Sequence, residues 1–207
     1  MNNLSRRVFS AAAALALSTV LAACGGDAGT SQGTDTASSA SPSSAASAQF
    51  NKADVQFASD MIVHHRGAID MAELAGDRAA MPEVKSLAAQ IKKAQQPEID
   101  TMSGWLQSWG EDVPAADDGG MHHDAGHAAD MPGMMTEQEM TALTDARGSA
   151  FDRMFLEMMI KHHEGAIDMS EGEQLEGDNA EAIALAKKIV ADQRAEIATM
   201  QDLLKRV

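Results

Sequence analysis

Two stretches of the chain share one pattern of apolar and polar positions. Residues 57–106 align with residues 155–204 without a gap, at a constant offset of 98 residues, and 21 of the 50 aligned residues are identical. In both stretches apolar residues recur at helical spacing, and Ala, Glu, Gln, Lys, Leu and Met dominate, which is typical of helices rather than strands. A repeat of this length indicates two copies of one structural unit.

Each copy is predicted to form a helical hairpin. Pro97 lies inside the second helix of the first copy, where the second copy has Ala195, so a kink is expected there rather than a break. A short extra helix is predicted over residues 137–143, after the capping pattern that begins at Thr136. The other helix starts are indicated by Asn51-x-x-Asp54, Ser149-x-x-Asp152, Pro82 and Asp178-x-x-Glu181.

Residues 112–135 separate the two hairpins and lack apolar periodicity. This segment is rich in Gly, Asp, His, Met and Pro, which predicts a long crossover loop. Such a length allows the hairpins to pack together as four helices. The expected fold is therefore all-α, a four-helix bundle of two duplicated hairpins within one domain at residues 50–207.

The N-terminal residues are typical of an export signal. Arg6 and Arg7 precede an apolar run, and the sequence Leu-Ala-Ala-Cys then ends at Cys24. This order predicts a signal peptide at residues 1–23. The residues around Cys24 resemble a bacterial lipobox, in which Cys24 is the lipidated residue, and those around Arg6 and Arg7 resemble a twin-arginine signal. An unmodified Cys24 after plain signal cleavage is the alternative. Residues 24–49, rich in Gly, Ser, Thr and Ala, are predicted to form a flexible tether. The expected location is the cell envelope, with the membrane reached through the lipid alone.

The charge and the cysteine content narrow the choice of partners. The net charge is −15, and removal of Arg6 and Arg7 with the signal peptide leaves 14 basic against 31 acidic residues, or −17. Such a surface repels nucleic acid and anionic lipid headgroups and attracts cations. With one cysteine, the chain can form no internal disulfide, and once Cys24 is acylated its sulfur is not available to bind a metal.

The strongest chemical pattern is a pair of adjacent histidines in each copy. At helical spacing the residues around each pair fall within an arc of about 120° on one face. Two imidazoles then lie between two thioethers, an arrangement that indicates metal ligation, although methionine core packing with hydrogen-bonded histidines is the alternative. The two faces comprise Met61, His64, His65, Ala68 and Met71, and Met159, His162, His163, Ala166 and Met169.

The crossover supplies a second group of candidate ligands. Its density of imidazoles and thioethers predicts a softer, flexible metal site, with an incidental polar loop as the alternative. Its residues are Met121, His122, His123, His127, Met131, Met134 and Met135. Imidazole with thioether suits copper, because thioether favours Cu(I) while imidazole also accepts Cu(II), and silver is chemically similar. Glu98, Glu196, Gln95 and Gln193 could orient the imidazoles, supply oxygen ligands or merely face solvent.

The repeated motifs resemble those of a known family. The doubled motifs Met-Ile-x-His-His-x-Gly-Ala-Ile-x-Met and Gln-x-x-Glu-Ile-x-x-Met are similar to those of the family called domain of unknown function 305. The resemblance implies a ferritin-like four-helix bundle and, for some members, copper binding in the envelope that supports copper tolerance. The motif positions it implies as ligands are Met61, His64, His65, Met71, Met102, Met159, His162, His163, Met169 and Met200.

We interpret the sequence as that of an envelope lipoprotein that sequesters or buffers copper and is not an enzyme. Storage and delivery to a partner both stay open. A non-metal interaction module, with the methionines as an adaptable groove, is one alternative. A di-iron oxidase is another, but it needs Glu-x-x-His motifs, and the residues three positions before the histidines are Met61, Ile62, Met159 and Ile160.

Overall fold

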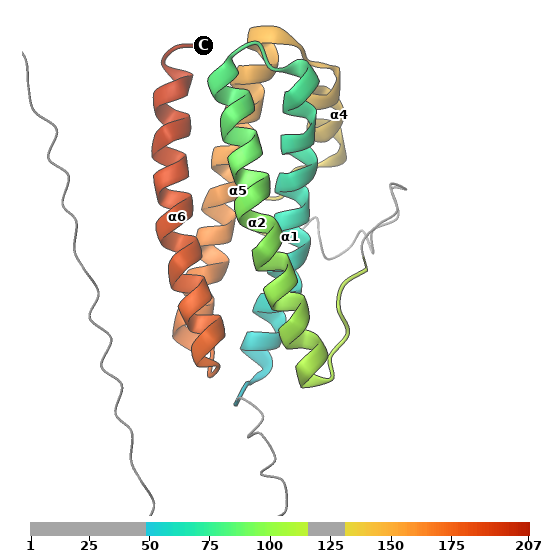
Figure 1. Cartoon of the computed structure of the whole chain (residues 1–207), viewed down its shortest axis with the longest axis vertical. Helices are drawn as coiled ribbons and strands as arrows, with labels where there is room; N and C mark the ends of the chain where they lie inside the picture. The colour runs from blue at the N-terminus through green and yellow to red at the C-terminus, as the bar shows by residue number, and fades with distance from the viewer. Residues whose placement is uncertain (1–48, 116–130) are drawn as a thin grey trace, which may run out of the picture. The chain divides into compact units, whose positions relative to one another are not determined.

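The computed structural model describes residues 49–115 and 131–207, and in these residues the only regular secondary structure is helical. Four long helices lie side by side, and a short one packs at their edge (Figure 1). The prediction of an all-α fold is confirmed. The expected signal peptide, Cys24 and nearly all of the tether lie outside the described residues. The helices are α1 (Lys52–Arg78), α2 (Pro82–Trp109), α4 (Glu137–Asp145), α5 (Gly148–Glu176) and α6 (Ala180–Leu204).

Local capping explains most of the helix boundaries. Asn51 and Thr136 close capping boxes at the starts of α1 and α4, and Pro82 occupies the first turn of α2. α2 continues through Pro97 without a break. Two starts differ from the prediction. The side chain that caps α6 is Asn179, one residue after the predicted Asp178, and α5 begins at Gly148 without any side-chain cap.

The uncapped start of α5 is explained by a contact between the hairpins. Asp152 accepts hydrogen bonds from the amides of Ala80 (3.0 and 3.2 Å) and Met81 (2.9 Å), where α2 begins. Asp54, 98 residues earlier, likewise accepts from the amides of Asp178 (3.2 Å) and Asn179 (2.9 Å), where α6 begins. The first helix of each hairpin therefore caps the second helix of the other, which gives the domain an internal two-fold relation.

These reciprocal caps predict a loss of stability on truncation. Asp152→Ala leaves the amides of Ala80 and Met81 without their acceptor, so we expect the free energy of unfolding to fall by about 1–2 kcal/mol. Urea denaturation measures this change. Asp145→Ala, at an exposed position on α4, is the control and should stay within about 0.5 kcal/mol of the parent. Equal effects of the two substitutions would contradict the capping role.

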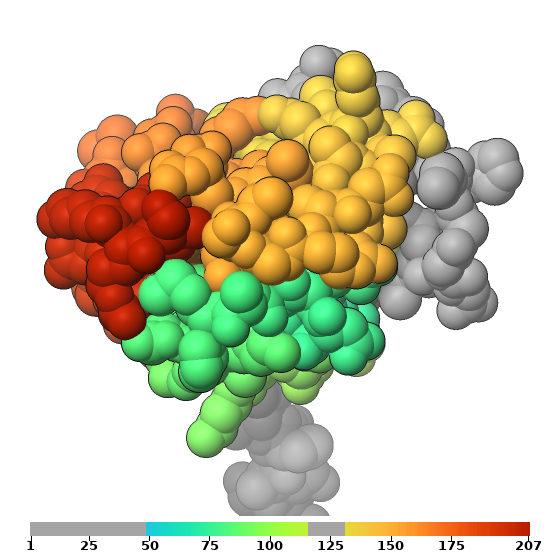
Figure 2. All heavy atoms as spheres, turned by 90° about the horizontal axis from the view of Figure 1, so that it is seen from above, coloured from blue at the N-terminus to red at the C-terminus, as the bar shows by residue number. Residues whose placement is uncertain are grey.

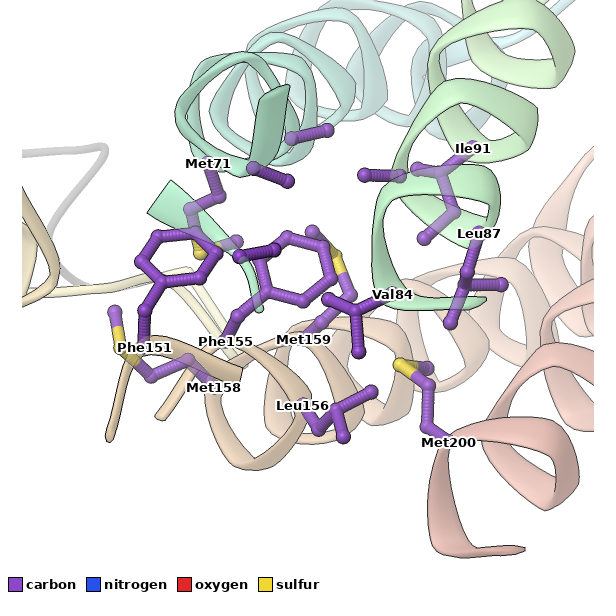
Figure 3. Close-up of a cluster of buried hydrophobic side chains, with 14 of the residues drawn as sticks. Met71, Val84, Leu87, Ile91, Phe151, Phe155, Leu156, Met158, Met159 and Met200 are labelled. Atoms are coloured by element: carbon purple, nitrogen blue, oxygen red, sulfur yellow. The ribbon is translucent and has the colours of Figure 1, made fainter. Parts of the chain in front are cut away.

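Two apolar clusters fill the interior, one toward each end of the helices. The first cluster contains Phe151, Phe155 and Leu156 of α5 together with residues of α1 and α2 (Figure 3). Figure 2 shows the end of the molecule that holds this cluster, where the α1–α2 hairpin (green) lies against α5 (orange). The other gathers Phe57, Ile62 and Leu106. Within the described ranges no helix is long and apolar enough to cross a membrane.

Candidate metal centre

The four histidines of the repeat motifs form a buried layer between the two apolar clusters. α1 and α5 pack antiparallel, so equivalent positions of the two copies meet at the middle of the domain. The rings of His64 and His162, the inner pair, lie in contact with centroids 3.7 Å apart and planes tilted by 42°. His65 and His163 form the outer pair, and all four residues are at most 1% exposed.

Each histidine of the outer pair is held by a carboxylate from the second helix of its own hairpin. His65 Nε2 lies 2.8 Å from Glu98 Oε2, and His163 Nε2 lies 2.6 Å from Glu196 Oε2. Because an ionised carboxylate only accepts, Nε2 is the donor and Nδ1 keeps its lone pair. Both Nδ1 atoms are buried and have no hydrogen-bond partner among residues 49–115 and 131–207. A carboxylate on one ring nitrogen and a free lone pair on the other is how proteins prepare a histidine to bind a metal.

The two carboxylates differ in their surroundings. Lys188 Nζ donates a hydrogen bond to Glu98 Oε1 at 2.8 Å. The residue that corresponds to Lys188 in the other copy, 98 positions earlier, is the uncharged Gln90. Burial favours the protonated form of Glu98, but hydrogen bonds from His65 and Lys188 outweigh it and hold the pKa of Glu98 below its usual range. Glu98 is therefore ionised at neutral pH, as an orienting acceptor must be.

The inner pair is kept neutral by its burial. His64 Nε2 donates to the Pro132 carbonyl at 3.0 Å. In the described part of the chain, His64 Nδ1 and both ring nitrogens of His162 have no hydrogen-bond partner. Burial, followed by the neighbouring His65, lowers the pKa of His64 to about 3. Burial and then His64 lower the pKa of His162 well below its usual value. Neutral imidazole is the form that binds metal ions.

The layer contains more unpartnered polar atoms than packing alone explains. Most buried polar groups in proteins are hydrogen-bonded, and each one left without a partner costs about 1–3 kcal/mol. The two glutamines one turn before Glu98 and Glu196 belong to the same group, since both are buried. Within the described residues, the buried atoms without a hydrogen-bond partner are Nδ1 of His64, His65 and His163, both ring nitrogens of His162, Nε2 and Oε1 of Gln95, and Oε1 of Gln193. These buried polar atoms indicate a site that a bound ligand completes.

The end of the crossover covers this layer. We refer to residues 131–135 as the strap. Its Gly133 has a φ of 77° and lies so close to α5 that a Cβ atom on Gly165 would fall 2.0 Å from the Pro132 oxygen. A Cβ on Gly67 would meet His162 Nε2 at 3.3 Å and the Met134 sulfur at 3.6 Å. The thioether of Met134 and the unpartnered nitrogen of His162 therefore converge beside Gly67.

The methionines of the helices lie mainly in the apolar clusters. Met71, Met159 and Met200 belong to the cluster that contains Phe151 and Phe155. Figure 3 shows Met71 beside Phe151, and Met200 beside Leu156 and Val84. Met61 and Met102 are fully buried in the other cluster, against which half-buried Met169 packs, while Met131 and Met135 are half-buried in the strap. This placement matches the packing alternative, and ligation by these sulfurs stays a prediction. The remaining crossover candidates, Met121, His122, His123 and His127, lie outside the described residues.

The site is not closed around an ion by His and carboxylate groups alone. Among the described residues, no three side chains of the types His, Cys, Asp or Glu already converge as a metal-binding set. The Met134 thioether, which lies with His162 Nε2 beside Gly67, is a candidate ligand of another type. The sequence predicts a separate site for the crossover methionines, whereas the structure brings Met134 to the helices.

The fold and the layer define a class of protein: an all-helical, internally duplicated domain with histidines buried where its two copies meet. Residues 54–204 match the family described as domain of unknown function (DUF305), and the chain belongs to that family. The predicted resemblance is thus confirmed. No curated protein matches the chain.

Several solved structures are similar to this chain. A DUF305 protein from Streptomyces coelicolor, described as a candidate secreted protein, is 35% identical, covering 74% of this chain and 93% of its own, with a TM-score of 0.64. A DUF305 fragment from Deinococcus radiodurans is 32% identical, covering 76% and 98%, with a TM-score of 0.66. CopM in its Cu(II)-bound form is 36% identical, covering 74% and 96%, with a TM-score of 0.62. CopM is also known in Cu(I)-bound, silver-bound and apo forms.

Proposed function

We propose that this protein binds copper in its histidine layer and sequesters or buffers it outside the cytoplasm. The observation that carries the proposal is a set of five buried imidazole nitrogens in one layer that have no hydrogen-bond partner among the described residues, with a thioether beside them. Neutral imidazole and thioether together suit copper in either oxidation state, and thioether favours Cu(I). That CopM has been solved with copper and with silver supports the choice of metal.

The residues of the layer suggest how the ligands divide. His64, His162 and Met134 are the proposed ligands where the two copies meet, and bound copper would replace the missing hydrogen-bond partners of the two histidines. His65 and His163 would offer Nδ1, with Glu98 and Glu196 fixing the orientation of the rings. The arrangement of the four long helices is proposed to be a four-helix bundle of the ferritin-like class. The protein is proposed to act by binding and not by catalysis.

The setting of this activity follows from the sequence. An N-terminal signal and a lipidated Cys24 would place the protein in the cell envelope, and the description of the Streptomyces coelicolor relative as a candidate secreted protein supports export. Copper held there in a buried site is withheld from reactions at the cell surface. We therefore propose that the protein supports copper tolerance, with metal ions as its ligands and no nucleic-acid partner.

The direct test is titration of metal-free protein. We expect Cu(I), supplied anaerobically against a competing chelator, to bind and to raise the melting temperature, because a ligand stabilises the state that binds it by about 2.7 kcal/mol at a hundred times its dissociation constant. Ca²⁺, which prefers oxygen ligands, is the control and should cause no rise. Absence of bound copper, or binding without stabilisation, would contradict the proposal. Oxidation of added Fe(II) would instead favour a di-iron enzyme.

A further inference from the structure

A second buried polar group lies far from the histidine layer, at the junction of α1, α5 and α6. Glu173, in the last turn of α5, is 2% exposed, and within the described residues neither of its oxygens accepts a hydrogen bond. The side chain lies against Gly177, where an added Cβ would fall 2.3 Å from Glu173 Oε1. A buried carboxylate without a donor is strongly disfavoured, so this group needs another source of stabilisation.

The neighbouring acid, Asp54, is in the opposite situation. It is fully buried and accepts hydrogen bonds from the amides of Asn51 (2.6 Å), Asp178 (3.2 Å) and Asn179 (2.9 Å). These amides belong to the starts of α1 and α6, whose dipoles also favour a negative charge. Glu173 lies instead at the C-terminal end of α5, where a negative charge is disfavoured. The environment thus stabilises the charge on Asp54 and not on Glu173.

We propose that Glu173 and Asp54 form a carboxylic acid–carboxylate pair that binds one proton, with the Glu173 hydroxyl donating to Asp54. Loss of that proton places two negative charges in a buried junction and weakens the attachment of the α5–α6 connection to the start of α1. The pair would make this junction sensitive to pH, independently of whether the histidine layer binds copper.

The electrostatics of the junction support this assignment. Burial, and then the hydrogen bond and charge of Asp54, raise the pKa of Glu173 to about 8. Burial opposes ionisation of Asp54 too, but its hydrogen bonds outweigh burial and hold its pKa below the usual value. Among the described residues, Asp54 is the charged group that acts on Glu173. The other titratable residues near the junction are exposed: Lys52, Glu176, Asp178 and Glu181.

The sign of the pH dependence follows from the raised pKa of Glu173. Its stabilising contribution is fully present below about pH 4.5, where the acid is protonated in the folded and unfolded states alike. The contribution is lost as the pH rises through about 8. Metal binding between the two acids is disfavoured, because backbone amides already occupy Asp54 and the positive ends of two helices point toward it.

The repeat supplies a comparison within the same chain. The residue 98 positions before Glu173 is Ala75, at the other end of the domain, and the residue equivalent to Asp54 is Asp152. Both are buried. The two junctions therefore share the capping aspartate and differ in the second carboxyl group. The proposal predicts that only the junction with Glu173 responds to pH in this range.

The test compares melting temperatures of the metal-free protein between pH 5 and pH 9. Glu173→Gln keeps the shape and a donor toward Asp54 but cannot ionise, so from pH 6 to pH 9 the parent should lose at least about 3 °C more than this variant. Glu176→Gln removes an exposed carboxyl from the same turn of α5 and should follow the parent. Titratable groups that all three proteins share change the three melting temperatures equally, so their effect cancels in the differences.

A second measurement keeps the test independent of how the variants fold. In the parent protein labelled with ¹³C at glutamate carboxyls, one resonance, absent from Glu173→Gln where that variant folds, should titrate well above pH 6. Parallel melting curves with no such resonance would overturn the proposal. So would Ca²⁺ restoring the parent's stability at pH 9, since that result would make the junction a cation site.

Discussion

His162→Leu is expected to stabilise the metal-free protein while weakening its binding of copper. His162 is 1% exposed, and no described residue forms a hydrogen bond with either of its ring nitrogens, so the folded state carries their desolvation without compensation. Leucine fills a similar volume without polar atoms, and we expect a gain of about 1–2 kcal/mol in the free energy of unfolding. Urea denaturation without metal and Cu(I) competition titration measure the two effects.

The neighbouring substitution has the opposite expected sign. His163→Leu removes the hydrogen bond to Glu196, whose side chain is 22% exposed, and leaves that carboxylate beside an apolar group. We expect a loss of about 1–3 kcal/mol in the metal-free protein, together with weaker copper binding. A purely structural role for the histidines predicts loss in both variants and unchanged copper uptake. That outcome would remove the histidine layer from the proposed function.

Much of the fold could be predicted from the sequence because its signals are local or repeated. The 98-residue offset predicts two hairpins, and the patterns at Asn51 and Thr136 correctly mark two helix starts. The pattern at Ser149 predicts a third local cap, but Asp152 binds the amides of the other hairpin instead. A capping pattern specifies a carboxylate near a helix start, whereas its partner depends on tertiary packing that the pattern does not contain.

The candidate site could be predicted only in part, for a similar reason. The paired histidines follow from helical spacing and from their recurrence in both copies. The strap does not, because residues 131–135 have no periodicity, and composition gives no indication of which methionine reaches the helices. One signal was available in the sequence. Gly67 and Gly165 recur in the middle of both helices, where glycine is unfavourable, and this recurrence indicates a close approach of another segment.

Gly165→Ala is expected to lift the strap from α5. Its Cβ would lie 2.0 Å from the Pro132 oxygen, 2.4 Å from the Pro132 carbonyl carbon and 2.8 Å from the Gly133 nitrogen, so backbone atoms must move. Gly133 lies against α5 as well, with a positive φ, which leaves the strap little room to adjust. We expect a loss of about 1–3 kcal/mol in the free energy of unfolding, although alanine favours a helix.

Gly172→Ala, on the same helix, is the matched control. A Cβ at Gly172 meets nothing within 4 Å, so this substitution should stabilise the protein by roughly 0.5–1 kcal/mol through helix propensity alone. Hydrogen exchange should show faster exchange of the strap amides in Gly165→Ala only. Because the displaced strap carries Met134 away from His162, Cu(I) affinity should fall more than Cu(II) affinity, since thioether favours Cu(I). If Gly165→Ala gains stability as Gly172→Ala does, the strap does not lie on α5 in solution, and Met134 loses its place among the proposed ligands.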